Sequence, residues 1–316
     1  MLLSPWLNWL LAVVLASCMV LLLPRLGRLK AGTTLDGVYG WALFAFLGAV
    51  LSDPLGTLLV DNDRESLRFA IACLQLCPTM ALLGVRKPHH RAWNVVVVSL
   101  WLVAVLPAGH AWLGRPLALH PARQWFMLGI MLLGIGNFLP TRFAIPGVIV
   151  GTLQLAGIAR YLPDTPVAWL GAWSSTGPVS PERLLAAAML LSGFWLGRGL
   201  PDRGSVTPLD RVWLDFRDLF GGLWALRVQE RVNAVARQNG WPLTLTWTGL
   251  RSERDAAPSS LSDERQRAVA TTMIGILRRF VTVDWMTQRG LPMSGSESAP
   301  ESASESLNSI RSRESR

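Results

Sequence analysis

The chain has 316 residues, of which 51% are hydrophobic and 16% are charged, and its formal net charge is +9 at pH 7. Because soluble domains carry about 25% charged residues, this composition argues against an ordinary soluble protein. The basic residues stand in short segments beside apolar runs, whereas a nucleic-acid-binding protein gathers them on one face or stripe. We therefore expect a protein of the lipid bilayer that does not bind nucleic acid.

Seven apolar runs within residues 1–200 predict a bundle of transmembrane helices. A hydrocarbon core about 30 Å thick requires about 20 apolar residues in helical form, and backbone groups in lipid must be hydrogen-bonded within the segment. The expected fold class is an all-α membrane protein with about seven spans. The runs cover residues 6–23, 37–60, 66–85, 93–113, 123–140, 143–162 and 181–199.

The first run leaves two alternatives open. The string Leu15-Ala16-Ser17-Cys18 resembles the cleavage box of bacterial lipoproteins, which would remove the run and attach lipid to Cys18. However, the run continues apolar past Cys18 and no basic residue precedes it, both of which are unlike a cleaved signal. We expect the run to be retained as the first span.

Arginine and lysine residues predict the orientation of the bundle, because cytoplasmic loops carry an excess of them. With seven spans, ten basic residues fall on one side and six on the other. The first loop on the less basic side is also acidic, through Asp61, Asp63 and Glu65. We expect the N-terminus outside and the C-terminus in the cytoplasm. The ten residues are Arg25, Arg28, Lys30, Arg86, Lys87, Arg91, Arg142, Arg198, Arg203 and Arg211.

Residues 201–290 predict a small cytoplasmic segment that begins with a long amphipathic helix. Thr207-Pro208 is typical of an N-cap followed by a first-turn proline, and apolar residues recur every three or four positions to about Gln238. The pair Gly221-Gly222 is expected to kink this helix. Asp215 and Asp218 are expected on its exposed face, in salt bridges with neighbouring arginines.

The rest of the segment predicts a strand and a second helix. Apolar residues alternate with threonines over 243–248, which indicates a strand, and no obvious second strand follows. A helix is expected over 262–280. A segment of roughly 90 residues has a marginal core of its own, so we expect it to lean on the membrane surface, on the span ends or on another subunit. The tail over 291–316 is rich in Ser and Glu and is expected to be disordered.

Asp53 is the candidate functional residue of the spans. It lies toward the outer end of the second run, beside Pro54 and Gly56. An acid at membrane depth is costly and faces a cavity or a partner, and proline and glycine can break a helix at a transporter site. The alternative is that Asp53 lies near enough to the outer interface to be hydrated, with Pro54 as a simple kink.

Metal, cofactor and catalytic motifs are absent from the sequence. Cys73 and Cys77 stand one turn apart and could begin a soft-metal site, but only histidines such as His110 and His120 could complete it. No metal-binding or haem-attachment spacing occurs, and no phosphate-binding loop or nucleophile elbow is present. We expect no metal, no cofactor and a non-enzymatic role.

Two stretches carry a resemblance to other proteins. One runs from Cys77-Pro78-Thr79-Met80 through Arg86-Lys87-Pro88 to Arg91-Ala92-Trp93, and the other spans residues 214–218 and 227–233. They resemble an uncharacterised family of bacterial multi-pass membrane proteins. The resemblance implies the bacterial inner membrane and carries no assigned activity, so no functional residue follows from it.

Three functional hypotheses remain from the sequence, and the third and least supported of them is a membrane enzyme with a haem or metal redox role. The first is a membrane anchor or scaffold that presents residues 201–290 to a protein partner or to a second copy. The second is a carrier of small solutes, coupled to protons or cations, with Asp53 at its site. Seven spans do not divide into two equal repeats, which weakens the carrier hypothesis.

Overall fold

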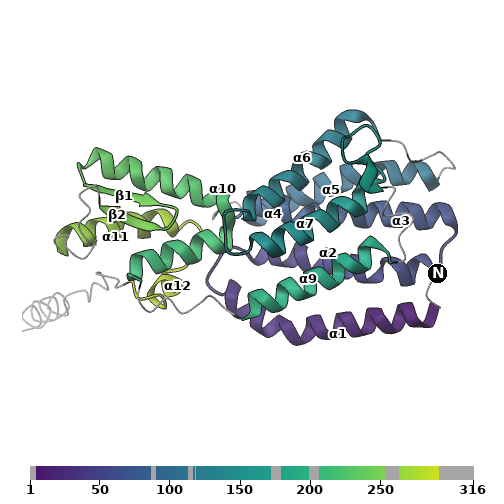
Figure 1. The fold of residues 1–316 in the computed structure, drawn as a ribbon, viewed down its shortest axis with the longest axis horizontal. Coiled ribbons are helices and arrows are strands. Elements are labelled where there is room, and N and C mark those ends of the chain that lie inside the picture. The colour runs from purple at the N-terminus through teal and green to yellow at the C-terminus, as the bar shows by residue number, and fades with distance from the viewer. Residues whose placement is uncertain are drawn as a thin grey trace, which may run out of the picture.

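The computed structural model of this chain is mainly helical, with a long bundle and a smaller C-terminal unit at one end of it (Figure 1). It describes residues 5–86, 90–112, 117, 119–171, 179–198, 206–252 and 263–291, so the predicted tail lies outside the described residues except for Leu291. The bundle helices are α1 (Pro5–Lys30), α2 (Asp36–Gly56), α3 (Asp61–Leu74), α4 (Cys77–Leu83), α5 (His90–Trp112), α6 (Pro121–Phe138), α7 (Ala144–Ala159) and α9 (Pro181–Gly197).

The C-terminal unit follows α9 in the chain. Its long first helix begins at an N-cap threonine, whose side chain accepts a hydrogen bond from the amide of Asp210, with proline in the first turn as expected. The unit comprises α10 (Pro208–Gln238), β1 (Leu243–Thr246), β2 (Gly249–Ser252), α11 (Asp263–Leu277) and α12 (Val283–Thr287).

Four helical stretches are long and apolar enough to cross a membrane, namely Pro5–Lys30, Asp36–Gly56, Asp61–Leu83 and Ala92–Gly109. They cover the first four predicted runs. The last three predicted runs contain α6, α7 and α9, which have 18, 16 and 17 residues. Among the described residues, the structure therefore supports four membrane-crossing helices by length and composition, against the seven predicted.

The third predicted run is not one continuous helix. α3 ends at Leu74 and α4 begins at Cys77, with a tight turn between them in which the Leu76 amide donates to the Cys73 carbonyl at 3.1 Å. Pro78 explains the break, because it has no N–H to bond the Leu74 carbonyl one turn earlier. By contrast, α1 runs unbroken through Cys18 to Lys30, beyond the predicted end of its run.

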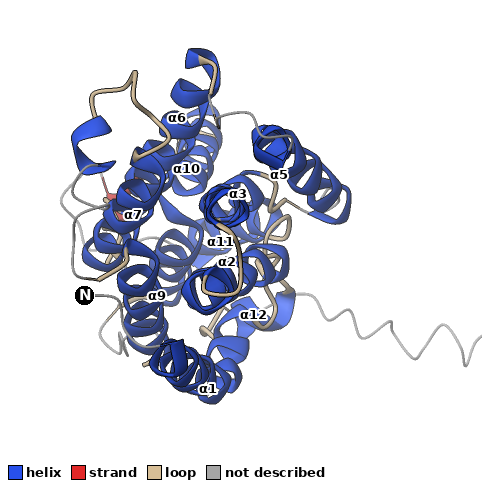
Figure 2. Cartoon of the chain, turned by 90° about the vertical axis from the view of Figure 1, so that its right-hand side faces the viewer, coloured by secondary structure: helices blue, strands red, loops and turns tan. Residues whose placement is uncertain are grey.

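The bundle helices run side by side between two ends. In Figure 2, viewed along the bundle from the end away from the C-terminal unit, α2 and α3 lie at the centre, and α1, α9, α7, α6 and α5 surround them except between α5 and α1. Their contacts follow this order, since α3 packs on α5 and α2, while α9 packs on α1, α2 and α7. The outer sides of the surrounding helices expose apolar side chains such as Leu21, Leu106 and Leu191.

Aromatic side chains build the core of the C-terminal unit. Phe216 and Phe220 stack with ring centroids 4.6 Å apart, and Phe280 meets them edge-on at 5.3 Å and 5.6 Å. Trp213 and Trp285 are fully buried beside them. The apolar face predicted for α10 is therefore the face that packs on α11, α12 and the hairpin.

The prediction that Asp215 and Asp218 lie on an exposed face is wrong. Both carboxylates are buried. Asp215 accepts a hydrogen bond from Arg289 at 2.8 Å, and Asp218 accepts one from Arg217 at 2.8 Å. Burial lowers the pKa of Arg289 below its ordinary value, and the nearby Asp215 carboxylate opposes that shift. Helical periodicity identified the apolar face, but the chain that covers the opposite face is distant in sequence.

The expectation that no second strand follows the first is also wrong. β1 and β2 form an antiparallel hairpin with Leu243 opposite Ser252 and Thr246 opposite Gly249. The Leu250 amide donates to the Asp210 carboxylate at 2.6 Å, which ties β2 to the start of α10. The second strand, Gly249-Leu250-Arg251-Ser252, contains a single large apolar residue, so it shows no alternating pattern.

Gly221 interrupts α10, as predicted, and brings the helix onto the end of α6. Its φ of +79° lies in the left-handed region, which glycine adopts without a Cβ clash. The side chain of Asn137 bridges the interruption, accepting from the Leu223 amide at 2.9 Å and donating to the Phe220 carbonyl at 3.4 Å. A buried polar side chain of α6 thus satisfies the backbone groups that the kink frees.

Two tryptophans join the C-terminal unit to the bundle. Trp224 donates to the Leu82 carbonyl at the end of α4 at 2.8 Å, and Trp247 donates to the Pro140 carbonyl after α6 at 2.7 Å. Leu82 belongs to the same apolar cluster as the core of the unit. Of the three supports expected for this segment, the span ends are therefore present within the chain itself.

Candidate functional site

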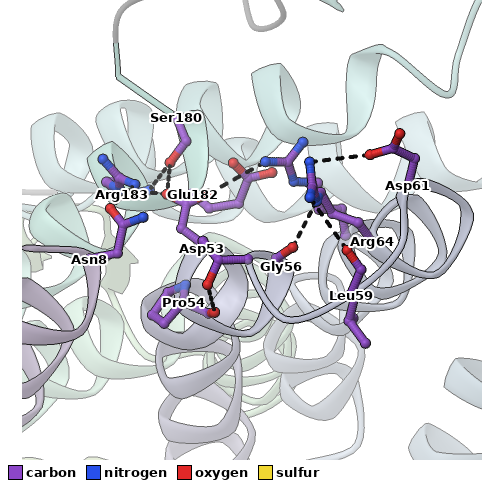
Figure 3. Close-up of polar contacts among 12 residues, drawn as sticks. Asn8, Asp53, Pro54, Gly56, Leu59, Asp61, Arg64, Ser180, Glu182 and Arg183 are labelled. Carbon is purple, nitrogen blue, oxygen red and sulfur yellow. Dashed lines mark hydrogen bonds and ion pairs between the residues drawn. The ribbon is translucent and has the colours of Figure 1, made fainter. Parts of the chain in front are cut away.

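Asp53 lies three residues before the end of α2, at the end of the bundle away from the C-terminal unit, and is only 8% exposed. Its carboxylate forms ion pairs with Arg183 of α9 at 2.5 Å and with Arg68 of α3 at 3.6 Å. The Ser180 hydroxyl donates to the same carboxylate at 2.6 Å (Figure 3). The structure thus gives Asp53 partners on two helices that are more than a hundred residues apart in sequence.

The start of α9 positions these partners. Ser180 is the N-cap residue, and its hydroxyl oxygen accepts a hydrogen bond from the Arg183 amide at 3.3 Å, with Pro181 in the first turn. The Arg183 guanidinium then reaches both Asp53 and the side-chain oxygen of Asn8 in α1, to which it donates at 2.6 Å. One partly buried arginine therefore links α1, α2 and α9 at the end of the bundle away from the C-terminal unit.

A second ion pair lies beside the first. Glu182 of α9 accepts from Arg160, the residue after α7, at 2.7 Å, and both side chains are largely buried. Arg64 of α3 donates to the Gly56 carbonyl at the end of α2 at 2.7 Å (Figure 3). We call Asp53, Arg68, Arg160, Glu182 and Arg183 the outer ion-pair cluster.

The outer ion-pair cluster is occupied by its own members. Its two carboxylates face three guanidinium groups, so the charge of Asp53 is already compensated by partners in the chain. A buried carboxylate that is ionised and paired in this way holds helices together, and removing one partner leaves a costly unpaired charge. This arrangement favours a structural role for Asp53 over an open binding role.

A small cavity of about 10 Å³ lies next to the cluster, between α3, α7 and α9, and is lined by Gln75, Gln154 and Glu182. The side-chain oxygen of Gln75 and one carboxylate oxygen of Glu182 are buried there with no hydrogen-bond partner in the chain. The size is that of a single water molecule. Asp53 does not line this cavity.

Cys73 and Cys77 are buried inside the bundle as free thiols. Their sulfur atoms lie near backbone carbonyls, at 3.8 Å from Ala104 and at 4.0 Å from Cys73 respectively. Among the residues that the structure describes, no group of three or more His, Cys, Asp or Glu side chains is placed to hold a metal ion. The side chain of His110 lies outside that description, so the pair with His120 is not placed.

The sequence identified Asp53 but missed its partners. Arg68 and Arg183 were counted only as orientation signals, because nothing in a single sequence pairs residues 53 and 183. The string Ser180-Pro181-Glu182 does carry an N-cap signal, and that signal locates the start of α9 and so the depth of Arg183. A search of this chain against family models, curated proteins and solved structures finds no match.

Proposed function

We propose that the chain is a seven-span protein of the bacterial inner membrane, with its N-terminus outside and its C-terminal unit in the cytoplasm. In addition to the four long stretches, α6, α7 and α9 run between the same two ends of the bundle (Figure 1). At a rise of 1.5 Å per residue these three helices are about 24–27 Å long, close to the hydrocarbon thickness of about 30 Å.

The surface of the bundle supports this proposal for the three shorter helices. Soluble monomers rarely expose large contiguous apolar patches, yet each of α6, α7 and α9 exposes several large apolar side chains. In the C-terminal unit, only Leu226 and Val283 do so among the described residues. The exposed side chains of the three helices are Trp125, Phe126, Leu132, Ile145, Val148, Ile149, Leu191, Phe194 and Trp195.

Reporter fusions test the topology. A cytoplasmic reporter such as green fluorescent protein and an exported alkaline phosphatase are fused after Gly84, after Trp112 and after Gln238. The proposal expects fluorescence but no phosphatase activity after Gly84 and Gln238, and the reverse after Trp112. Phosphatase activity after Gln238 would contradict a cytoplasmic C-terminal unit.

The molecular role that the geometry supports best is that of an anchor holding the C-terminal unit as a fixed platform for an acidic protein partner. The unit is joined to the bundle by Trp224, Trp247 and Asn137 through the hydrogen bonds given above. Its exposed charged side chains, where described, are seven arginines and two acids. The arginines are Arg227, Arg231, Arg237, Arg251, Arg267, Arg278 and Arg279.

The single observation that carries this role is the basic surface on a rigidly attached unit. Charge on a protein surface steers association with partners of the opposite sign. The described residues of the unit form no exposed apolar face, so we propose that its arginines bind the partner. Self-association through residues 201–290 would bring like charges together and is less supported.

Charge reversal tests the platform. The full-length chain is compared with Arg231→Glu/Arg237→Glu and with the charge-conserving control Arg231→Lys/Arg237→Lys. We expect chemical cross-linking in whole cells to join wild type and control to the same acidic protein, and the Glu variant to lose that product while still inserting in the membrane. If cross-linking yields no such product, or the Glu variant retains it, the proposal fails.

The carrier alternative draws less support from Asp53, because its carboxylate is paired with Arg68 and Arg183 and does not line the small cavity beside the cluster. A reconstituted uptake assay distinguishes the two roles. Asp53→Asn should abolish coupled flux if Asp53 is a transport site. Under the structural role, any loss of flux should follow the loss of folded protein.

A further inference from the structure

A second, much larger pocket lies in the half of the bundle next to the C-terminal unit. It has a volume of about 360 Å³ and is bounded by α1, α2, α4, α6, α7, α9 and α10. This volume is within the range of about 300–1,000 Å³ that is usual for small-molecule sites. The pocket is separate from the outer ion-pair cluster, since none of the cluster's five residues lines it.

The wall of the pocket is predominantly apolar. Leu26, Val38, Ile135, Val150 and Met189 contribute from five different helices. Such a wall favours aliphatic chains, because burying methylene groups away from water is favourable in proportion to the area buried. A polar solute would find few partners along this surface, so the ligand must be largely hydrocarbon.

Charge is confined to the end of the pocket near the C-terminal unit. The two charged side chains that line it are Lys30, the last residue of α1, and Asp218 of α10. Asp218 is fully buried and compensated by Arg217 at 2.8 Å and Arg142 at 3.9 Å. Its negative charge is therefore already balanced by arginines of the chain.

Lys30 is different, because the carboxylate that it pairs with belongs to a surface residue. Its ammonium lies 2.8 Å from Asp36, whose side chain is 68% exposed, and 4.6 Å from the centre of the Tyr39 ring, which also lines the pocket. An ion pair exposed to this degree contributes little to stability, so an anion held at the pocket mouth can replace Asp36. The mouth thus carries an available cation above an apolar interior.

The pocket is much larger than the small cavity, whose volume of about 10 Å³ is that of one water molecule. It therefore has room for an aliphatic chain. One available cation suits a ligand with one anionic group. Gln154 lies at the inner part of the pocket and lines the small cavity as well, which marks the depth to which the chain extends.

We propose that this pocket binds a single-chain amphiphile with an anionic headgroup, of the class of long-chain fatty acids. The chain lies between α2 and α7, and the carboxylate pairs with Lys30 beside Tyr39. The C-terminal unit forms part of the site through Leu219 and Asp218, so the ligand contacts both parts of the protein. This proposal does not depend on the platform role.

Photolabelling tests the proposal. The full-length chain in phosphatidylcholine nanodiscs is exposed to a myristic acid analogue with a diazirine at the end of its chain. We expect saturable labelling of peptides from α2, α6, α7 or α9, with competition by myristate and about five- to tenfold weaker competition by the uncharged myristyl alcohol. Labelling that does not saturate, or equal competition by both compounds, would overturn the proposal.

Two pairs of variants make the test specific. Val150→Phe fills the pocket, whereas Val148→Phe enlarges an exposed residue of the same helix. Only the first should abolish saturable labelling. Lys30→Gln should reduce competition by myristate to the level of myristyl alcohol, and Arg28→Gln, on the exposed surface nearby, should not. The Lys30 side chain is partly exposed, so Lys30→Gln should leave the fold intact. If myristate still competes better than myristyl alcohol in this variant, the headgroup assignment is refuted. This result holds even if Val150→Phe fails to fold.

Discussion

Replacing Asp53 by asparagine is expected to destabilise the bundle by about 2–3 kcal/mol. The change removes the charge that compensates Arg183 and Arg68 but keeps an oxygen for the Ser180 hydroxyl. Breaking a fully buried ion pair costs about 3–5 kcal/mol, because the remaining charge is left uncompensated in the protein interior. Asp53 is 8% exposed and the asparagine oxygen still accepts a hydrogen bond, so we place the cost below that range.

The matched control is Asp61→Asn at the same end of the bundle. Asp61 pairs with Arg64 at 3.4 Å, but its side chain is 93% exposed, so the loss should be at most about 0.5 kcal/mol. Both variants are unfolded reversibly by sodium dodecyl sulfate in mixed micelles and followed by tryptophan fluorescence. The double variant Asp53→Asn/Arg183→Gln should lose less than the sum of its two single variants, because the two residues share one interaction.

A cost below about 1 kcal/mol for Asp53→Asn would equal that of an exposed surface pair and would contradict the prediction. Losses of the two single variants that add up to that of the double variant would contradict it as well. In either case Asp53 does not hold helices together, and its burial requires another cause.

Three further substitutions test the attachment and the core of the C-terminal unit. Gly221→Ala should lower the melting temperature strongly, because its φ is +79° and the new Cβ would collide with the Asn137 side chain. The control Gly275→Ala has open space around its Cβ and should be neutral or slightly stabilising. Trp224→Phe should lower the free energy of unfolding by about 1–3 kcal/mol, because the Leu82 carbonyl loses its hydrogen bond from the indole. The control Trp169→Phe, at an exposed residue, should change the melting temperature very little. Arg289→Met should cost about 1.5–3 kcal/mol by removing the charged hydrogen bond to Asp215, and a melting temperature equal to wild type would show that this bond does not contribute.

Local patterns located several elements of the C-terminal unit well. Thr207-Pro208 marked the start of α10, and Gly221 marked its interruption, because capping, proline chemistry and left-handed backbone depend on adjacent residues. The strand β2 was missed since Leu250 is its only large apolar residue and no alternation results. Asp215 and Asp218 were misplaced because burial of the second face of α10 depends on α12 and on the loop after α6.

The apolar runs, their helical structure and the isolated acid Asp53 within them could be predicted from the sequence. Hydropathy and helix propensity are properties of short segments, so they need no knowledge of the fold. Three features become visible in the tertiary structure alone. Asp53 pairs with Arg68 and Arg183, and the C-terminal unit is attached to the bundle through Trp224 and Asn137. A pocket of about 360 Å³ lies next to that unit. These features join residues that are distant along the chain. Their proximity is set by the packing of whole helices, which no local pattern records.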